Sequence, residues 1–219
     1  MELHPILAAV ALVVQFHEGR EIGTASGFFY RLAEERYFVT NKHVVAGEPG
    51  QPKPDELRLR LHLDAKNLTQ NDWLSLPLYK KGAKVWKEHP TADIDVALVP
   101  LKDVDMGRFF VTWLQPSDHL PDRFVLHPGE DVFLLGYPRA FFDSQHNLPV
   151  FRNPFIASAY GVPFKGQPGF LTDARLQPGM SGSPVLTKPK NMWVDAQGNT
   201  SVMSGTTYFL LGVHSGTVM

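Results

Sequence analysis

Hydrophobic and polar residues alternate most regularly between residues 57 and 63, where leucine occupies every odd position and Arg58, Arg60 and His62 lie between them. A period of two residues is typical of a half-buried β-strand. Similar short runs recur along the whole chain, and no helical pattern lasts three turns or more. The pattern predicts strands at residues 8–17, 26–31, 37–40, 56–63, 74–78, 84–88 and 96–101, and again at residues 132–136, 155–160, 170–174, 183–186 and 208–213.

The two series of strands are separated by residues 103–130, where three prolines cluster. Two β-rich halves of this size fit two small barrels better than one sandwich. We therefore expect an all-β chain of two antiparallel, six-stranded barrels, formed by residues 1–105 and 106–219. Residues 137–153 and 187–206 are expected to be long connections, the second with a turn at residues 195–199. Such loops are usually functional or mobile, and surface excursions without a role are the alternative.

The composition narrows the classes of function. The chain has 219 residues and no cysteine, which excludes disulfides, thiolate metal sites, iron–sulfur clusters and a cysteine nucleophile. A formal net charge of −1 argues against nucleic acid as a partner. The longest apolar run, residues 6–14, is shorter than the roughly 20 residues of a membrane span, and its flank lacks the lysine or arginine of a signal peptide. We interpret this run as a buried first strand and expect a cytoplasmic protein with no membrane partner.

Three residues in separate stretches can do chemistry together. Ser181 lies in a glycine-rich turn, and a serine hydroxyl needs an adjacent base to act as a nucleophile. The glycines of this turn allow two backbone N–H groups to point the same way, as an oxyanion site requires. His43 follows a predicted strand, and Asp95 opens another. Asp93 is the rival carboxylate, and we favour Asp95 because the apolar run begins directly after it.

Each of these residues alone has an ordinary structural explanation, and their combination is more specific. His43 and Asp95 lie in the first half of the chain and Ser181 lies in the second. A buried aspartate needs a hydrogen-bond partner, and a histidine N–H is a suitable one. The order therefore favours a base, an orienting acid and a nucleophile that meet in a cleft between two barrels.

The sequence resembles the chymotrypsin-fold serine proteases, in particular bacterial trypsin-like enzymes of the HtrA type and the glutamyl endopeptidases. Residues 40–45, Thr-Asn-Lys-His-Val-Val, are similar to the HtrA-type Thr-Asn-x-His-Val-Val, and residues 23–29 resemble the Gly-Ser-Gly-Phe strand before it. Residues 172–182 resemble Thr-Asp-Ala followed by Pro-Gly-Asn-Ser-Gly. Residues 179–185 match the glutamyl endopeptidase version at all but the second position. Residues 211–216 resemble the strand that lines the primary specificity pocket.

The resemblance implies a chymotrypsin-like fold and a serine endopeptidase that acts on polypeptides through an acyl-enzyme intermediate. Ser181 would attack, His43 would act as base and then as acid, and Asp95 would hold the imidazole tautomer. The N–H groups of Gly179 and Ser181 would form the oxyanion hole.

The residues expected to contact the substrate lie mainly near the end of the chain. The backbone around Ser215 and Gly216 would pair with the substrate as an added strand. His214 stands where glutamyl endopeptidases use a histidine to read an acidic side chain, and Arg175 is a second candidate cation. Leu176 stands about where that family has a hydroxyl, so an apolar pocket above a packed His214 is the alternative.

The sequence departs from the family at two points. Met180 replaces the aspartate that receives a freed N-terminus in the pancreatic enzymes, so activation by clipping is not expected. The family has a further strand, and usually a helix, after the position of His214. The second barrel is therefore expected to lack its last strand, or to be completed by further domains or a partner chain. No cofactor or metal is expected, since the nine histidines form no His-Glu-x-x-His motif.

A protease-fold binding module without turnover is the main alternative function. A missing last strand or a misformed oxyanion turn would silence the site. An α/β-hydrolase is disfavoured, because it needs Gly-x-Ser-x-Gly and the order Ser, Asp, His. This chain has Ser183 at the second glycine position and the opposite order.

Overall fold

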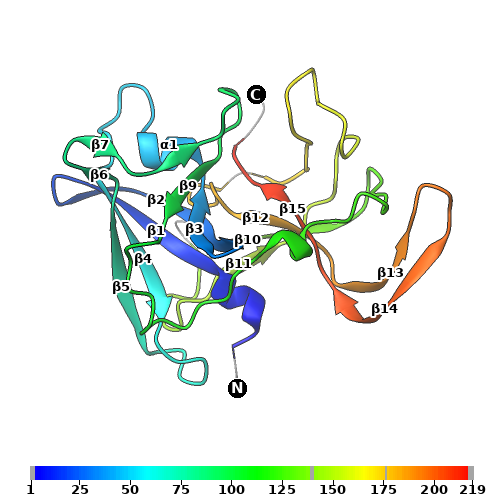
Figure 1. The fold of residues 1–219 in the computed structure, drawn as a ribbon, viewed down its shortest axis with the longest axis horizontal. Helices are drawn as coiled ribbons and strands as arrows, with labels where there is room; N and C mark the ends of the chain where they lie inside the picture. Colours follow the sequence, from blue (N-terminus) through cyan, green and yellow to red (C-terminus); the bar gives the residue numbers. More distant parts are fainter. Residues whose placement is uncertain (1–2, 139–140, 176, 217–219) are drawn as a thin grey trace.

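The computed structural model describes residues 3–138, 141–175 and 177–216, and most regular structure in them is β-strand. The helical elements are short: η1 (Pro5–Ala9), α1 (Lys42–Ala46) and η2 (Pro116–Asp118). None of the helices in these three ranges is long and apolar enough to cross a bilayer. The strands gather in two groups side by side, which confirms the expected all-β, chymotrypsin-like arrangement of two barrels (Figure 1).

The first group is an antiparallel sheet of seven strands in the order β5-β4-β1-β2-β3-β9-β8. Its strands are β1 (Val10–His17), β2 (Arg20–Leu32), β3 (Glu35–Thr40), β4 (Glu56–His62), β5 (Asn71–Pro77), β8 (Lys87–Glu88) and β9 (Ala97–Pro100). A small hairpin of β6 (Tyr79–Lys80) and β7 (Ala83–Lys84) connects β5 to β8. In β4 the leucines are buried and the arginines between them are half-buried, as the alternation predicts.

The second group is a sheet of four strands in the order β11-β10-β12-β15. Its strands are β10 (Val132–Gly136), β11 (Val150–Arg152), β12 (Pro184–Thr187) and β15 (Leu210–Val213). The remaining strands, β13 (Lys190–Val194) and β14 (Thr200–Thr207), form a hairpin that projects from the molecule (Figure 1). The hairpin replaces the long connection expected at residues 187–206, although its turn lies where the sequence placed it. A projecting ribbon has little buried face, so its sequence lacks a clear alternation.

Two expected strands, residues 155–160 and 170–174, are absent as regular strands. They meet at an isolated bridge between Ile156 and Thr172 and at a hydrogen bond from Ala157 N to Leu171 O of 2.7 Å. Two neighbouring backbone amides donate to side chains: Phe155 N donates to Asp173 Oδ1, and Leu171 N donates to Ser158 Oγ. An amide that donates to a side chain is not available to a backbone carbonyl, and the regular ladder is interrupted at these positions.

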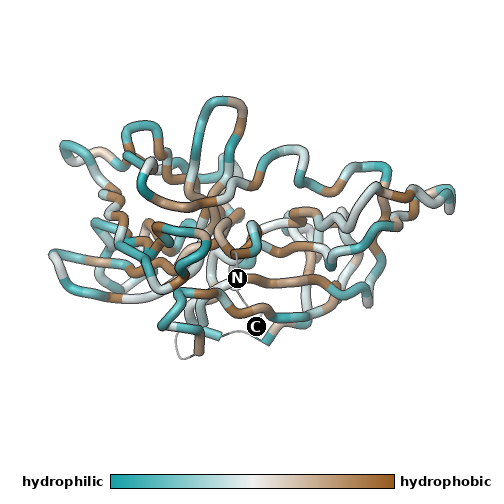
Figure 2. Tube along the Cα trace, turned by 90° about the horizontal axis from the view of Figure 1, so that it is seen from below, coloured by the Kyte–Doolittle hydropathy of each residue, from teal (hydrophilic) through white to brown (hydrophobic). Residues whose placement is uncertain are grey.

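The core consists of three clusters, one inside each barrel and one between them. Strand β1 is apolar on both faces because both faces are buried. Ala11 and Val13 pack in the core of the first barrel. Val10, Leu12 and Val14 pack in the cluster between the barrels. Figure 2 shows hydrophobic residues concentrated in the interior and hydrophilic ones mainly in the outer loops. Met106 and other residues just beyond the expected boundary at 105 pack on the first core. The boundary itself stays a prediction.

Candidate active site

His43 and Asp95 are brought together by the ends of two paired strands. Strand β3 ends at Thr40 directly opposite Ala97, the first residue of β9. His43 follows in α1, and Asp95 precedes β9, so both side chains emerge at the same edge of the sheet. His43 Nδ1 lies 2.7 Å from Asp95 Oδ2, and the backbone N–H of His43 donates to Asp95 Oδ1 at 3.0 Å. The carboxylate therefore holds the histidine through both its ring and its backbone.

The bond from the imidazole to Asp95 fixes which ring nitrogen carries the proton. An ionised carboxylate only accepts hydrogen bonds, so Nδ1 is the donor and Nε2 keeps a free lone pair. Asn41 Nδ2 donates to the backbone oxygen of Asp95 at 2.7 Å and so anchors the segment that bears the carboxylate. The His43 and Asp95 side chains are each 29% exposed, which leaves the ring accessible from solvent.

Ser181 lies in a turn that is clamped by the first barrel. Ser26, in the middle of β2, donates from its backbone N to Ser181 O at 2.8 Å and from its hydroxyl to Gly179 O at 2.7 Å. Thr40 Oγ1, three residues before His43, donates to Ser26 O at 2.8 Å. The backbone of Gly182 packs so closely here that a Cβ would collide with Ser26 O and Thr40 Oγ1. The turn of barrel two is therefore seated on the strands that lead to His43.

Two backbone N–H groups in the Ser181 turn have no acceptor among the described residues. Across the turn, Met180 N donates to Gln177 O and Gly182 N donates to His214 O. Within the described part of the chain, Gly179 N and Ser181 N donate to no other residue. Gly179 is buried and has a φ of +95°, which is favourable only for glycine. A buried N–H without a partner is costly, so the N–H of the buried Gly179, close to that of the half-buried Ser181, indicates a site for an external acceptor.

The imidazole of His43 and the hydroxyl of Ser181 are not hydrogen-bonded to each other in the structure. Among the described residues, the ring of His43 bonds to Asp95 alone. The catalytic bonds of hydrolases are often long without substrate and shorten when it binds. The structure thus places His43 and Asp95 in hydrogen-bond contact and packs the Ser181 turn against the strands that lead to His43. It shows no hydrogen bond between His43 and Ser181.

A cavity of about 580 Å³ lies next to this group, between the strand end at His214 and the loop of residues 164–174. Its walls include Asp95, His214, Ser215 and Gly216. His214 belongs to the scaffold as well, because its backbone N donates to Ser183 O at 2.8 Å. Burial lowers the pKa of the His214 imidazole, which favours the neutral ring.

Two further expected specificity residues, Arg175 and Leu176, are not among the described residues of this cavity wall. Arg175 is exposed and is not part of the cavity wall, and Leu176 lies outside the described residues. The described residues also contain no group of three or more His, Asp or Glu side chains arranged to hold a metal ion.

A family model described as a trypsin-like peptidase domain matches residues 25–193, which is most of the chain. The chain belongs to the trypsin-like peptidase family. Among solved structures, a serine endoprotease from Yersinia pestis is similar with a TM-score of 0.51 and 15% sequence identity. That match covers 94% of this chain but only 59% of the endoprotease, and at this identity it shows the fold alone. A search of curated proteins finds no match.

The part of this trypsin-like peptidase that matches the family model contains His43, Asp95 and Ser181 but ends before His214. One structural residue of the site, Ser26, was not singled out from the sequence. The only local signal was a serine close to Ala25 and Phe28 in a predicted strand, and the structure shows that this side chain has no exposed surface and so needs partners within the protein.

Proposed function

We propose that this trypsin-like peptidase is a serine endopeptidase with Ser181, His43 and Asp95 as its catalytic triad. The observation that carries the proposal is the pair of N–H groups at Gly179 and Ser181, which have no acceptor among the described residues, in a turn seated on the strands that lead to His43. This arrangement provides a place for negative charge to develop beside a hydroxyl and a base.

In the first half of the proposed reaction, Ser181 Oγ attacks the carbonyl carbon of the scissile peptide, and its proton moves to His43 Nε2. Asp95 keeps Nδ1 protonated and stabilises the resulting imidazolium. The oxyanion accepts hydrogen bonds from Gly179 N and Ser181 N, each contributing about 3–4 kcal/mol to transition-state stabilisation. The tetrahedral intermediate then collapses, the C–N bond breaks, and the leaving amine takes the proton from His43.

In the second half, water attacks the acyl ester of Ser181 while His43 accepts its proton. Collapse of the second intermediate returns that proton to Ser181 Oγ and releases the carboxylic acid. We assign substrate binding to the backbone of Ser215 and Gly216, which are exposed beside the cavity, and to its wall at His214. Arg175 and Leu176 stay predictions from the sequence.

Covalent labelling tests the proposal directly. A fluorophosphonate probe, which reacts with activated serine hydroxyls, is expected to label the wild-type protein and not the Ser181→Ala variant. Ser204→Ala removes an exposed hydroxyl from β14 and is the matched control, so its labelling should equal that of wild type. Undiminished labelling of Ser181→Ala would refute the assignment.

The alternative is a protease-fold binding module without turnover. The absence of a hydrogen bond between His43 and Ser181 among the described residues is the observation that favours this alternative. The same experiment decides between the two, because a silent module leaves the wild-type protein unlabelled while a peptide substrate can still bind.

A further inference from the structure

The connection between β10 and β11, which the sequence singles out as long, contains a turn at residues 143–148 that is folded by its own aspartate. Asp143 Oδ1 accepts from Gln145 N at 3.1 Å and from His146 N at 3.0 Å. Asp143 Oδ2 accepts from His146 Nδ1 at 2.9 Å. Leu148 N donates to Asp143 O at 3.2 Å and closes the turn. An aspartate that accepts from the amides following it stabilises a defined turn, so this segment has one preferred shape.

Three hydrogen bonds dock this turn on the end of β4 in the first barrel. Arg60 Nη1 donates to Ser144 O at 3.0 Å, and Asn147 Nδ2 donates to Arg60 O at 3.0 Å. His62 Nε2 lies 2.8 Å from His146 O, and a carbonyl only accepts, so the ring is the donor. Asn147 and His62 are 1% and 4% exposed, so their bonds are shielded from water. A turn of the second half of the chain is therefore fixed to a strand that lies 84 to 87 residues earlier in the sequence.

Tyr137 connects the docked turn to the turn that bears Ser181. Its hydroxyl donates to Asn147 O at 3.0 Å, and its backbone N donates to Ser26 Oγ at 2.8 Å. Ser26 Oγ in turn donates to Gly179 O. A hydroxyl has one proton and accepts through its lone pairs, so the N–H of Tyr137 leaves the Ser26 proton to Gly179 O. Tyr137 thus fixes the direction of the bond by which Ser26 holds the Ser181 turn.

The surroundings of Tyr137 restrain both its backbone and its side chain. Gly136 directly before it packs so closely that a Cβ would collide with Ser183 Oγ and Ser26 Oγ. Phe142 packs edge-on against the Tyr137 ring, with ring centroids 5.5 Å apart. Burial raises the pKa of the Tyr137 phenol well above its ordinary value, so the hydroxyl keeps its proton and stays a donor. A change at the hydroxyl is therefore expected to reach the end of β10, where Ser26 is bonded.

From these contacts we propose that Tyr137 is a positioning residue for the oxyanion site, an inference that rests on the proposed function of the Ser181 turn. Tyr137 does not contact the substrate. Its hydroxyl, held by the docked turn, sets the backbone N–H that orients Ser26, and Ser26 holds Gly179 O. Gly179 has no side chain to restrict its backbone, so the bond to its oxygen limits rotation of the peptide groups beside the two oxyanion N–H groups.

The test removes the phenol oxygen alone. Tyr137→Phe keeps the buried ring and deletes the bond to Asn147 O. Removing an oxyanion donor outright costs about 10²–10³ in kcat. Loosening the turn while both donors remain should lower kcat about fivefold and change KM by less than about twofold. Hydrolysis of a quenched fluorescent peptide gives both constants, and thermal unfolding establishes that the variant is folded.

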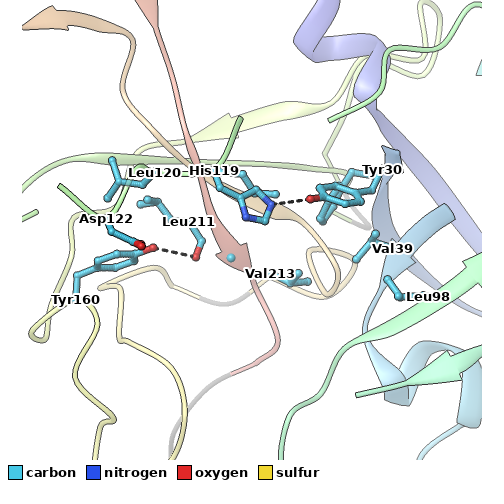
Figure 3. Close-up of a pocket in the computed structure, with 12 residues that line it drawn as sticks. Tyr30, Val39, Leu98, His119, Leu120, Asp122, Tyr160, Leu211 and Val213 are labelled. Carbon is cyan, nitrogen blue, oxygen red and sulfur yellow. Dashed lines mark hydrogen bonds between the residues drawn. The ribbon is translucent and has the colours of Figure 1, made fainter. Parts of the chain in front are cut away.

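Tyr30→Phe is the matched control. The Tyr30 hydroxyl lies 3.0 Å from His119 Nε2, so this substitution also removes a phenol bond of 3.0 Å between distant parts of the chain (Figure 3). Among the described residues, the Tyr30 hydroxyl has no bond to Ser26 or to the Ser181 turn. Both constants should equal those of wild type. An equal loss of kcat in Tyr30→Phe and Tyr137→Phe would mean that any loosening of the fold lowers activity, and would overturn the proposal.

A double-mutant cycle tests the route through Ser26. If Tyr137 acts through Ser26, then Tyr137→Phe causes no further loss of kcat in a protein that already carries Ser26→Ala. Losses that multiply would show that the two residues act independently, which contradicts the proposal.

A second variant approaches the same contacts from the docked turn and serves if Tyr137→Phe does not fold. Asn147 has a φ of +53°, which glycine adopts readily, so Asn147→Gly keeps the backbone and removes the bond to Arg60 O. We expect kcat to fall about twofold to threefold with KM unchanged, because the acceptor of the Tyr137 hydroxyl is held less firmly. An unchanged kcat would separate the docked turn from the site and overturn the proposal.

A measurement on the free protein distinguishes failure of this proposal from failure of the proposed function. Backbone ¹⁵N relaxation gives order parameters for the N–H groups of Gly179 and Ser181 without any substrate. They should be lower in Tyr137→Phe than in wild type and in Tyr30→Phe. If the wild-type protein is not labelled by the fluorophosphonate probe, the proposed function fails, and the order parameters still decide whether Tyr137 positions the turn. Unchanged order parameters in Tyr137→Phe overturn the positioning role, even where Ser181 is labelled.

Discussion

The two barrels differ in how firmly they hold the parts of the candidate active site. In the first barrel, seven strands form one sheet, and the paired ends of β3 and β9 position His43 and Asp95 directly. In the second, the main sheet has four strands, and Ser181 lies on a turn outside it. The turn is held by Ser26 of the first barrel as well as by its own sheet. The difference teaches that the turn bearing Ser181 is held in place largely by the neighbouring barrel.

The largest effect is expected from the carboxylate that the first barrel positions. Asp95→Asn replaces the carboxylate oxygen that accepts from Nδ1 of His43 with an NH2 donor, which favours the wrong tautomer of the imidazole, and kcat should fall about 10⁴-fold. Hydrolysis of a quenched fluorescent peptide measures this loss. Asp93→Asn is the matched control, because Asp93 is exposed, two residues away and not bonded to His43. A larger loss for Asp93→Asn than for Asp95→Asn would reverse the assignment.

The next largest effect is expected from a substitution at Gly182, where the second barrel packs against Ser26 of the first. Gly182→Ala should lower kcat by a factor of about 10² or more and reduce the free energy of unfolding by about 3 kcal/mol, since its Cβ would collide with Ser26 O. Gly198 has a similar φ of +84° but open space around it, and Gly205 has neither constraint. Urea unfolding should therefore rank Gly182→Ala above Gly198→Ala, and Gly205→Ala last. Equal losses for the first two would show that backbone strain alone, and not the contact, matters.

A smaller effect is expected when the hydrogen bond from Ser26 to Gly179 is removed by a substitution that causes no steric clash. Ser26→Ala leaves Gly179 O and Tyr137 N without their buried partner, which costs about 1–3 kcal/mol of stability. We expect kcat/KM to fall roughly tenfold, because the oxyanion turn loses one of its anchors. Ser117→Ala, at an exposed serine, is the control. Unchanged kcat/KM in Ser26→Ala would mean that the second barrel orders its own nucleophile.

The smallest effect concerns the pH dependence of stability and compares the buried His62 of the first barrel with the half-buried His214 of the second. Burial lowers the pKa of His62 and of His214 in the folded state. The unfolded chain, with histidine pKa values near about 6.5, then binds more protons, so stability falls as the pH drops below that value. Urea unfolding at pH 7.5 and 5.5 should show a smaller pH dependence for His62→Gln and for His214→Gln than for wild type. An unchanged slope in both variants would contradict this origin.

Much of the fold was predictable because the strands carry local signals. The leucines of β4 are buried as their spacing predicts, and the barrel arrangement agrees with the motif order. The strands expected at 155–160 and 170–174 were wrong, because side chains such as Ser158 bond the amides that a ladder would use. The hairpin of β13 and β14 was missed, since its exposed Met192 and Val202 give no amphipathic pattern.

The site residues that belong to local sequence motifs were predictable. The contacts between distant parts of the chain that hold these residues in place were not. His43, Asp95 and Ser181 were chosen from their local sequences, and the structure places the first two in hydrogen-bond contact. Their catalytic roles remain a proposal. The clamp by Ser26 depends on a partner in the other half of the chain, which no local pattern reveals.

The bond between Ser26 and Gly179 also bears on the time at which the protein becomes active. Its partners are 153 residues apart in the sequence, and contacts between such distant residues form late in folding because a long loop must first close. During synthesis the N-terminal half emerges first and has no turn to clamp. The Ser181 turn thus acquires its final setting only after both halves have docked, so we expect the proposed nucleophile to be set in place late in folding.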